Sequence, residues 1–329
     1  MRHDRNLAVG EGADKPALIV FGPTASGKSA LAITLATRLG GTVINADSMQ
    51  VYRELRVLTA RPTHGEEALV PHRLYGVRPA AESSSVAWWR DAAFEAMAAA
   101  NAQGRIPILC GGTGLYLAAL TQGLAAIPDA GPTARTEGRA LLAELGSAGL
   151  HARLSEADPA SAARLRPSDG QRIARAWEVW RGTGRGLAAW QREPTAPASG
   201  WRFAAIVLDP PRADLRAAIA VRFHQMLAQG AIEEVRALLA RRLDPALPVM
   251  RAHGVPEIAG FLRGEIAIEE AARRAILATG QYTKRQATWL RGRPLVPTAT
   301  HTIHARFTSE TQLSQSILSE IGDFVRMAG

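Results

Sequence analysis

The chain has 329 residues, of which 47% are hydrophobic, so it can bury a sizeable core in two domains or in one core with an inserted lobe, and wholesale disorder is excluded. Its single cysteine, Cys110, excludes an intrachain disulfide, and no ligand spacing typical of a structural zinc site occurs. The net charge of +9 favours a polyanionic partner. Because neither a secretion signal nor a membrane-spanning apolar run is present, we expect a soluble cytoplasmic protein without membrane contact.

The first 125 residues predict strands that alternate with helices. After a loose N-terminal tail (1–14), the expected elements are a strand (16–22), a helix (28–40), a strand (42–46), a helix (84–104) and a strand (106–110) that runs through a Gly-rich turn into a helix. Such alternation is typical of a parallel sheet covered by helices on both faces. In these sheets, ligands bind at the carboxyl ends of the strands.

The pattern changes near residue 126, where a helical stretch without a convincing strand begins. Helices are expected at 133–149, 159–165 and 170–183, and a return linker at 182–200. A strand (203–211) then precedes helices at 212–229, 231–242, 254–263 and 266–292. We therefore predict an α/β core of residues 15–125 plus 201–298, a helical insertion domain of 126–200, and a C-terminal tail of 299–329.

The stretch "VFGPTASGKSALA" (20–32) matches the phosphate-binding pattern G-x-x-x-x-G-K-[ST]. Its backbone N–H groups and the helix that follows it favour phosphate oxygens, Lys28 supplies a positive charge, and Ser29 can hold Mg²⁺. A chance match in a chain of this length is on the order of one per cent. The expected fold is therefore α/β with a P-loop NTPase-like parallel sheet core, helices on both faces and an inserted all-helical lobe.

Two further segments follow predicted strands and should lie at the same edge of the sheet. Asp47, in "INADSMQVY" (44–52), is interpreted equally well as a ligand-facing carboxylate and as the N-cap of a short helix that starts at Ser48. In "CGGTGLYL" (110–117), the glycines permit close approach of the backbone to a ligand, and Thr113 would project its hydroxyl into the site. Three such segments at one edge predict a common site.

Basic residues gather in two parts of the chain. Six lie between Arg273 and Arg293 without an acid, and Lys284, Thr288 and Arg291 have the spacing of one helix face. Six arginines lie between Arg164 and Arg185 against two acids. A solvated surface is the common explanation of one such run. Two of them, one in the core and one in the insertion, favour nucleic acid as the partner.

Together, "GPTASGKS" (22–29), "NADSMQVY" (45–52), "GGTGLYL" (111–117), "QRIARAWEVWRGTG" (171–184) and "YTKRQATWLRG" (282–292) resemble the bacterial tRNA dimethylallyltransferase family, also called the tRNA isopentenyltransferase or IPP transferase family. The resemblance covers residues 22 to 291, in the family's order. It implies transfer of a dimethylallyl group from dimethylallyl diphosphate to the exocyclic amine of adenosine 37 of tRNA, beside the anticodon, with release of diphosphate. It also implies Mg²⁺ as cofactor and the tRNA anticodon stem-loop as partner. We expect a monomer.

The resemblance also assigns roles to individual residues. Asp47 would be the general base, Thr113 would orient the reacting groups, and Lys28 and Arg251 would contact the diphosphate as further catalytic residues. The diphosphate would be bound by the whole loop: Gly22, Pro23, Thr24, Ala25, Ser26, Gly27, Lys28 and Ser29, with the metal on Ser29. The tRNA would be bound by Asp47, Ser48, Met49, Gln50, Thr113, Arg135, Gln171, Arg172, Ile173, Ala174, Arg175, Lys284 and Arg285.

The sequence departs from the commonest family pattern at several positions. Leu58 and Arg61 stand in "LTARP" for Gly and Lys, "HRLYG" (72–76) lacks an acid, and Gly280 replaces a frequent Arg. Three alternative functions fit the sequence less well than a prenyltransferase. A small-molecule kinase would lack the extended basic surface. An RNA-binding protein with an inert P-loop would not need Lys28 and Asp47 together. A free-nucleotide prenyltransferase would not need the insertion.

Overall fold

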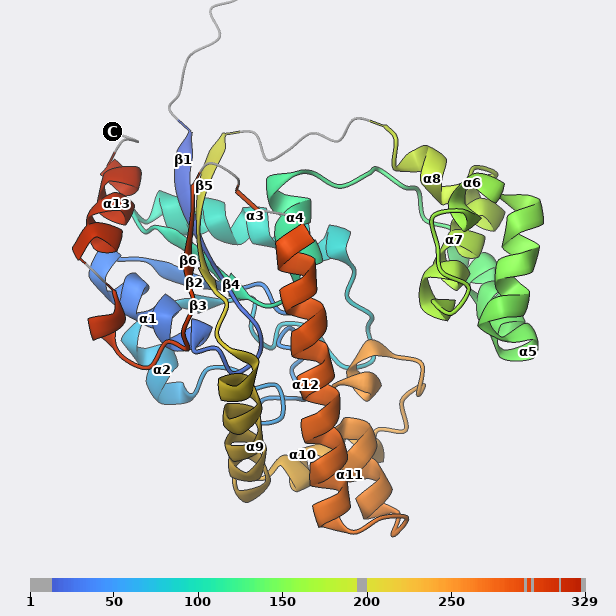
Figure 1. Cartoon of the computed structure of the whole chain (residues 1–329). Coiled ribbons are helices and arrows are strands. Elements are labelled where there is room, and N and C mark those ends of the chain that lie inside the picture. The colour runs from blue at the N-terminus through green and yellow to red at the C-terminus, as the bar shows by residue number, and fades with distance from the viewer. Residues whose placement is uncertain (1–13, 194–199, 293–294, 297–298, 314, 327–329) are drawn as a thin grey trace, which may run out of the picture. The chain divides into compact units, whose positions relative to one another are not determined.

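The computed structural model describes residues 14–193, 200–292, 295–296, 299–313 and 315–326 (Figure 1). The chain divides into two compact units, of which unit 1 comprises Met1–Thr121 and Ala198–Gly329, and unit 2 comprises Gln122–Pro197. The predicted N-terminal tail lies outside the described residues except for Asp14. No helix in the described ranges is both long and apolar enough to cross a bilayer.

Unit 1 is built on a parallel six-stranded sheet in the order β3-β2-β4-β1-β5-β6. The strands are β1 (Lys15–Phe21), β2 (Thr42–Asn45), β3 (His72–Arg73), β4 (Pro107–Gly111), β5 (Trp201–Leu208) and β6 (Thr300–Ile303). The three strands whose ends were expected to form the site are neighbours, because β4 pairs with β2 on one side and with β1 on the other. The prediction of a parallel sheet whose strand ends converge is therefore confirmed.

Alternate residues of the central strands face two separate hydrophobic clusters, as the pleat of a strand requires. Ile19 and Phe21 of β1 belong to a cluster that also contains buried residues of the helices α3, α4 and α9–α12. Leu18 and Val20 belong to a second cluster, with α1 and α13. Because both faces of the sheet are covered, its strands consist of continuous apolar runs, which is why they could be recognised in the sequence.

The helices of unit 1 that were expected, which exclude α2 and α13, end within a few residues of their expected limits. They are α1 (Lys28–Leu39), α2 (His64–Leu69), α3 (Val86–Ala102), α4 (Gly114–Thr121), α9 (Arg212–Ala228), α10 (Ala231–Ala240), α11 (Val255–Leu262), α12 (Ile268–Gly292) and α13 (Gln315–Arg326), with short 3-10 turns η1 (Pro248–Arg251) and η2 (Glu310–Gln312). The helix α2 was not predicted. It is only six residues long and is held by a capping box between Thr63 and Glu66, not by an apolar stripe.

The interpretation of residues 299–329 as a tail is wrong. The strand β6 pairs with β5 along Thr300–Ile303 and forms an edge of the sheet. The helix α13 covers the second cluster with Ile317 and Ile321. The strand is short and only partly buried, so its sequence lacks the long apolar run by which the central strands were recognised.

Unit 2 is helical and has its own core. It contains α5 (Gly131–Ala157), α6 (Pro159–Ala162), α7 (Gly170–Thr183) and α8 (Leu187–Trp190), the last of which lies in the segment expected to be a linker. The helix α5 is interrupted at Gly146, where φ is 67° and ψ is 179°. Leu150, Leu154, Ile173 and Trp177 form the centre of its hydrophobic cluster.

Candidate functional site

The phosphate-binding loop joins β1 to α1, as the pattern predicts. Gly27 lies at the start of α1 with φ of 91°, a conformation that favours glycine, and Ala25 adopts φ of 66° despite its side chain. The loop carries the residues Gly22, Pro23, Thr24, Ala25, Ser26, Gly27, Lys28 and Ser29 that were assigned to a diphosphate. A helix N-terminus preceded by a left-handed turn leaves N–H groups free to bind an anion.

Lys28 is almost completely buried, with 8% of its surface exposed. Burial lowers its pKa because the ammonium group loses water, and the nearby Asp47 carboxylate opposes this shift. A bound diphosphate would neutralise the buried positive charge of this ammonium group. The electrostatic effect of Asp47 on Lys28 also places the predicted base and the predicted phosphate ligand in one site.

The structure places Asp47 in a turn and not at the N-cap of a helix. Its Oδ1 accepts a hydrogen bond from Met49 N at 2.9 Å, so the carboxylate closes a local turn, although no α-helix starts at Ser48. Asn45 holds the same turn, since its Oδ1 accepts from Asp47 N at 2.8 Å. The carboxylate is therefore held just after β2, within electrostatic reach of Lys28.

Thr113 joins the Gly-rich loop to the Asp47 turn. Its Oγ1 accepts a hydrogen bond from Ser48 N at 3.0 Å, and its own N–H donates to Ala46 O at 3.2 Å. A Cβ on Gly111 would lie 2.1 Å from the backbone of Ala46, so glycine is required there for the two segments to approach. The structure thus brings together the predicted residues Lys28, Asp47 and Thr113.

The helix α12 lines the other side of the Gly-rich loop with one face. Tyr282, Gln286 and Trp289 are spaced i, i+4 and i+7 and therefore point the same way. The Tyr282 hydroxyl is hydrogen bonded to the side chain of Thr113, and burial raises the pKa of Tyr282 to about 12, so it remains protonated. The indole of Trp289 fills the space where a Cβ on Gly114 would lie, 2.3 Å from Cε3.

Gln286 connects the Gly-rich loop to the phosphate-binding loop. Its Nε2 donates to Gly112 O at 2.8 Å and its Oε1 accepts from Thr24 N at 3.1 Å. The side chain is 4% exposed, so these partners are not readily replaced by water. Sequence reasoning named Lys284 and Arg285 in this motif and missed Gln286, although its i+4 spacing from Tyr282 could have indicated the buried face.

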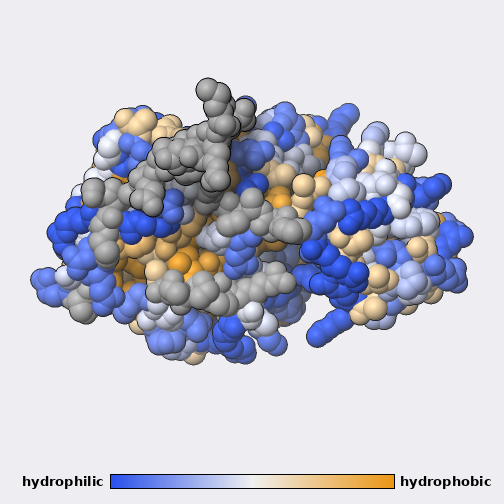
Figure 2. All heavy atoms as spheres, turned by 90° about the horizontal axis from the view of Figure 1, so that it is seen from above, coloured by the Kyte–Doolittle hydropathy of each residue, from blue (hydrophilic) through white to orange (hydrophobic). Residues whose placement is uncertain are grey.

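The opposite face of α12 carries the predicted basic surface. Lys284, Arg285, Thr288 and Arg291 are exposed. Arg273 and Arg274 both pair with Glu270, at 2.7 Å and 2.6 Å, so the basic run is partly neutralised at its start by an acid just outside it. Figure 2 shows one face of the molecule, on which hydrophilic side chains predominate and hydrophobic ones gather in smaller areas.

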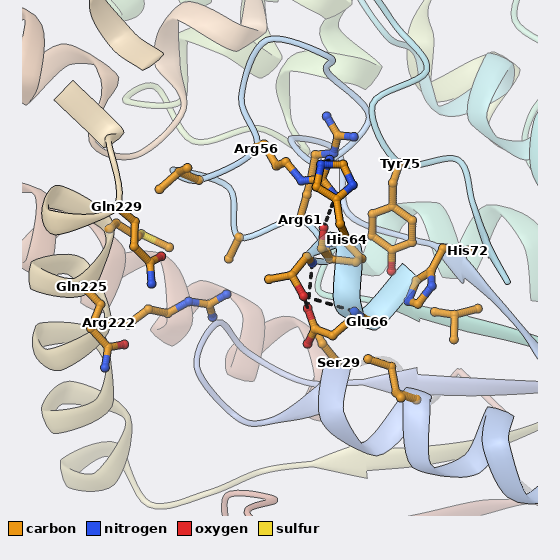
Figure 3. Close-up of a pocket in the computed structure, with 17 residues that line it drawn as sticks. Ser29, Arg56, Arg61, His64, Glu66, His72, Tyr75, Arg222, Gln225 and Gln229 are labelled. Atoms are coloured by element: carbon orange, nitrogen blue, oxygen red, sulfur yellow. Dashed lines mark hydrogen bonds between the residues drawn. The ribbon is translucent and has the colours of Figure 1, made fainter. Parts of the chain in front are cut away.

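A cavity of about 390 Å³ opens beside Ser29, between α1, α9, β3 and the loop before α2 (Figure 3). Its volume is within the range of small-molecule sites. Arg222 reaches into it from α9, and His72 and Tyr75 lie on the opposite side. Apolar side chains complete the lining, among them Ile33, Val43, Val57 and Met226.

Arg222 was not predicted, because nothing in its local sequence distinguishes it from other helical arginines. Of the three arginines that line the cavity, Arg56 pairs with Glu67 at 2.9 Å and Arg61 donates to backbone carbonyls, including that of Arg53 at 3.2 Å. Arg222 makes no hydrogen bond or ion pair with the described residues. Burial lowers its pKa, and the Asp47 carboxylate raises it, which places this guanidinium in the same electrostatic site as Lys28.

The predicted catalytic residue Arg251 ends η1 and is exposed. No ion pair joins its guanidinium to the residues that the structure describes. Its role toward a diphosphate therefore stays a prediction, whereas Arg222 lines the cavity beside Ser29 and lies within electrostatic reach of Asp47.

The predicted tRNA-contacting residues of unit 2 lie on two of its helices. Arg135, on α5, pairs with Asp129. Gln171, Arg172 and Arg175 lie in the first turns of α7 with their side chains exposed, while Ile173 and Ala174 are buried and serve the core of the unit. Arg172 pairs with Asp169 at 3.5 Å and Arg175 with Glu178 at 3.3 Å. Exposed pairs of this kind contribute little stability, so the arginines can exchange partners.

A metal could be held only with help from a ligand. Within the described ranges, no group of three or more His, Cys, Asp or Glu side chains could bind an ion. Mg²⁺ in phosphate sites is commonly held by one or two side chains together with substrate oxygens. Ser29, which lines the cavity at the start of α1, fits that arrangement.

Family models match almost the whole chain. The model described as IPP transferase matches residues 50–293, and the model described as Isopentenyl transferase matches residues 16–78. The tRNA dimethylallyltransferase of Granulibacter bethesdensis is 63% identical over 314 residues, covering 95% of this chain and 98% of that protein. The tRNA dimethylallyltransferase of Gluconobacter oxydans is 58% identical over 312 residues, covering 94% of each.

Solved structures resemble this fold over nearly its full length. The tRNA isopentenylpyrophosphate transferase of Bacillus halodurans superposes with a TM-score of 0.67 at 30% identity, covering 96% of this chain and 98% of that one. A eukaryotic dimethylallyltransferase acting on tRNA gives a TM-score of 0.79 at 24% identity, covering 95% and 80%. The latter likeness concerns the fold.

Proposed function

The chain belongs to the IPP transferase family, and from this premise we propose that it is a tRNA dimethylallyltransferase. It transfers a dimethylallyl group from dimethylallyl diphosphate to the exocyclic amine of adenosine 37 in tRNA and releases diphosphate. The observation that carries this proposal is the placement of Asp47 at the end of β2, where its carboxylate acts on the buried Lys28 of the phosphate-binding loop. A base for the acceptor and a cation for the leaving group thus lie in one site.

We assign the diphosphate to the loop that begins α1 and to the cavity beside it. Lys28 and Arg222 neutralise the negative charge that develops on the departing diphosphate, which is electrostatic stabilisation of the leaving group. Ser29 and diphosphate oxygens would hold Mg²⁺, which supplies further positive charge at the same leaving group. The apolar lining of the cavity, with Val57 and Met226, suits the five-carbon chain.

In the reaction, the bond between C1 of the prenyl group and the diphosphate oxygen breaks, and a bond from the adenine amine nitrogen to C1 forms. Asp47 accepts the proton that the amine loses. Tyr282 and the backbone N–H of Ser48 hold Thr113, which orients the amine beside Asp47. The adenine must leave its stack to reach this position, which is easier in a single-stranded anticodon loop than in a duplex.

The arginines of unit 2 and the exposed face of α12 are assigned to the tRNA phosphates. Arg135, Arg172 and Arg175 are themselves exposed and each forms an ion pair with one acid, so phosphate oxygens can replace those partners. Lys284 and Arg285 are exposed on α12. This assignment requires that tRNA binding weakens as salt rises, because bound counterions are released when the complex forms.

The test is to incubate the purified protein with Mg²⁺, dimethylallyl diphosphate and unmodified tRNA, and to analyse the nucleosides by mass spectrometry. We expect prenylated adenosine. In Asp47→Ala, turnover falls by on the order of 10²–10⁴ while tRNA binding in a filter assay persists, because a general base contributes about that factor. Asp91→Ala, at an exposed position of α3, is the matched control. ATP-dependent phosphorylation of a metabolite without prenylated adenosine would contradict the proposal.

A further inference from the structure

The segment between β6 and η2 crosses the outer side of the phosphate-binding loop and is bonded to it. Arg306 Nε donates to Ala25 O at 2.9 Å, and Phe307 N donates to Ser26 O at 2.8 Å. These carbonyl groups belong to consecutive residues of the loop whose N–H groups face a phosphate in proteins of this pattern. The segment thus holds the loop through the backbone carbonyl groups of these two residues.

The segment packs closely against the loop. A Cβ on Gly27 would lie 2.1 Å from Phe307 O, so the segment packs directly on the backbone at the start of α1. The Phe307 side chain is 4% exposed and belongs to the cluster that α1 and α13 share. Ala25 adopts positive φ without being glycine, a conformation that persists only where its surroundings hold it.

The segment is itself anchored on both sides. Before it, β6 pairs with β5 through Leu208 and Ile303. After it, α13 packs through Ile317 and Ile321 against the cluster that α1 also lines. Arg306 is therefore held by the elements on both sides of the segment, and its carbonyl also accepts a hydrogen bond from Gln312 Nε2 at 2.7 Å.

Arg306 also adds positive charge near the site. The pKa of Arg222 is lowered mainly by burial, and the nearby positive charge of Arg306 lowers it further. The positive charge of Arg222 is repelled by Arg306 and itself repels Lys28 in the free protein. A bound anion of high charge removes that repulsion, whereas a neutral ligand would not.

We propose that the segment between β6 and η2 is part of the diphosphate site, with Arg306 as a positioning residue. Arg306 holds Ala25 and Ser26 in the conformation that binds the diphosphate, and its charge attracts the same anion. The inference rests on the proposed function, and it assigns to the C-terminal part of the chain a role in donor binding and not in tRNA binding.

The test compares Arg306→Ala with Arg306→Lys and with the control Glu310→Gln, which removes an exposed ion pair just after the segment. Binding of inorganic pyrophosphate with Mg²⁺ is measured by calorimetry, and KM is measured separately for dimethylallyl diphosphate and for tRNA. We expect Arg306→Ala to weaken pyrophosphate binding and to raise the donor KM by on the order of tenfold, as expected for loss of a charged hydrogen-bond donor. The KM for tRNA stays unchanged, Arg306→Lys restores part of the affinity, and Glu310→Gln behaves as wild type.

Equal pyrophosphate affinity in wild type and Arg306→Ala would overturn the inference, as would an equal loss in Glu310→Gln or a wild type that binds no pyrophosphate. Thermal melts of each variant ensure that binding is compared between folded proteins. The inference can also hold while the proposed function fails. That outcome requires that wild type binds pyrophosphate, that Arg306→Ala weakens this binding, and that wild type nevertheless forms no prenylated adenosine. The two conclusions can therefore be told apart.

Discussion

Replacement of Gln286 by methionine should uncouple the two loops of the site. Methionine has about the same length and no amide, so Gln286→Met removes both hydrogen bonds of the side chain without opening a large cavity. Gly112 O is left buried without this donor, and Thr24 N is left without this acceptor. An unsatisfied buried group costs about 1–3 kcal/mol, and because Thr24 is only half-buried, we expect a loss of about 2–4 kcal/mol for the pair.

The change should affect catalysis beyond its effect on stability. The same bonds set the distance between the diphosphate loop and the loop that holds Thr113, and a displacement of about 1 Å between reacting groups can lower a rate by roughly 10². Urea denaturation gives the free energy of unfolding, and single-turnover prenyl transfer at a temperature where all variants are folded gives the rate. Gln281→Met, at an exposed position of the same helix, is the control and should match wild type in both assays.

Two results would refute this reasoning. If Gln286→Met unfolds at the same urea concentration as wild type, water or rearranged side chains satisfy the two backbone groups, and the bridge is not structural. If the variant loses stability and keeps the wild-type single-turnover rate, the relative position of the two loops does not depend on Gln286.

Three other changes test the electrostatics and the packing. Lys28→Met should raise Tm, because burial lowers the lysine pKa and a buried ammonium destabilises the folded protein, while turnover falls by on the order of 10²–10³. In thermal melts, the Tm difference between the variant and wild type should narrow as pH rises toward the pKa of lysine in the unfolded state. Gly280→Ala should stabilise the protein by about 1 kcal/mol in urea denaturation, since Gly280 lies within α12 with open space where a Cβ would project, and a loss of stability would contradict this. Cys110, whose pKa burial raises to about 11, should resist iodoacetamide at pH 8 until urea unfolds the chain, and fast labelling of the native protein would disprove its burial.

Much of the site could be predicted because its elements are local patterns. The phosphate-binding loop needs glycine, lysine and serine at set spacings, and the apolar runs beside it form strands that both faces of a sheet bury. Asp47 and Thr113 follow two such strands, and in a parallel sheet the ends of neighbouring strands meet at one edge. These facts place Lys28, Asp47 and Thr113 together without knowledge of the packing.

Charge was harder to interpret from the sequence. Arg181 pairs with Glu137 at 3.0 Å, although 44 positions separate them, and Arg273 pairs with an acid just before the run that was counted. A run of basic residues thus overstates the free positive charge of a surface, because partners from other turns and helices are not visible in the run itself. Lys284 and Arg291 on the exposed face of α12 have no acid beside them on this helix, because the acids of α12 lie in its first turn.

What the sequence alone determined is the chemistry of the site: a loop for phosphate, a carboxylate and a threonine at adjacent strand ends, and the family in which these occur together. What the tertiary structure decided is how these parts are held. Gln286 meets Thr24 across 262 positions of the chain, and Arg306 meets Ala25 across 281. Contacts of this range depend on the order of the strands and on which helix face packs inward. Local propensity does not encode them, because each partner lies in an ordinary segment until the sheet brings the two together.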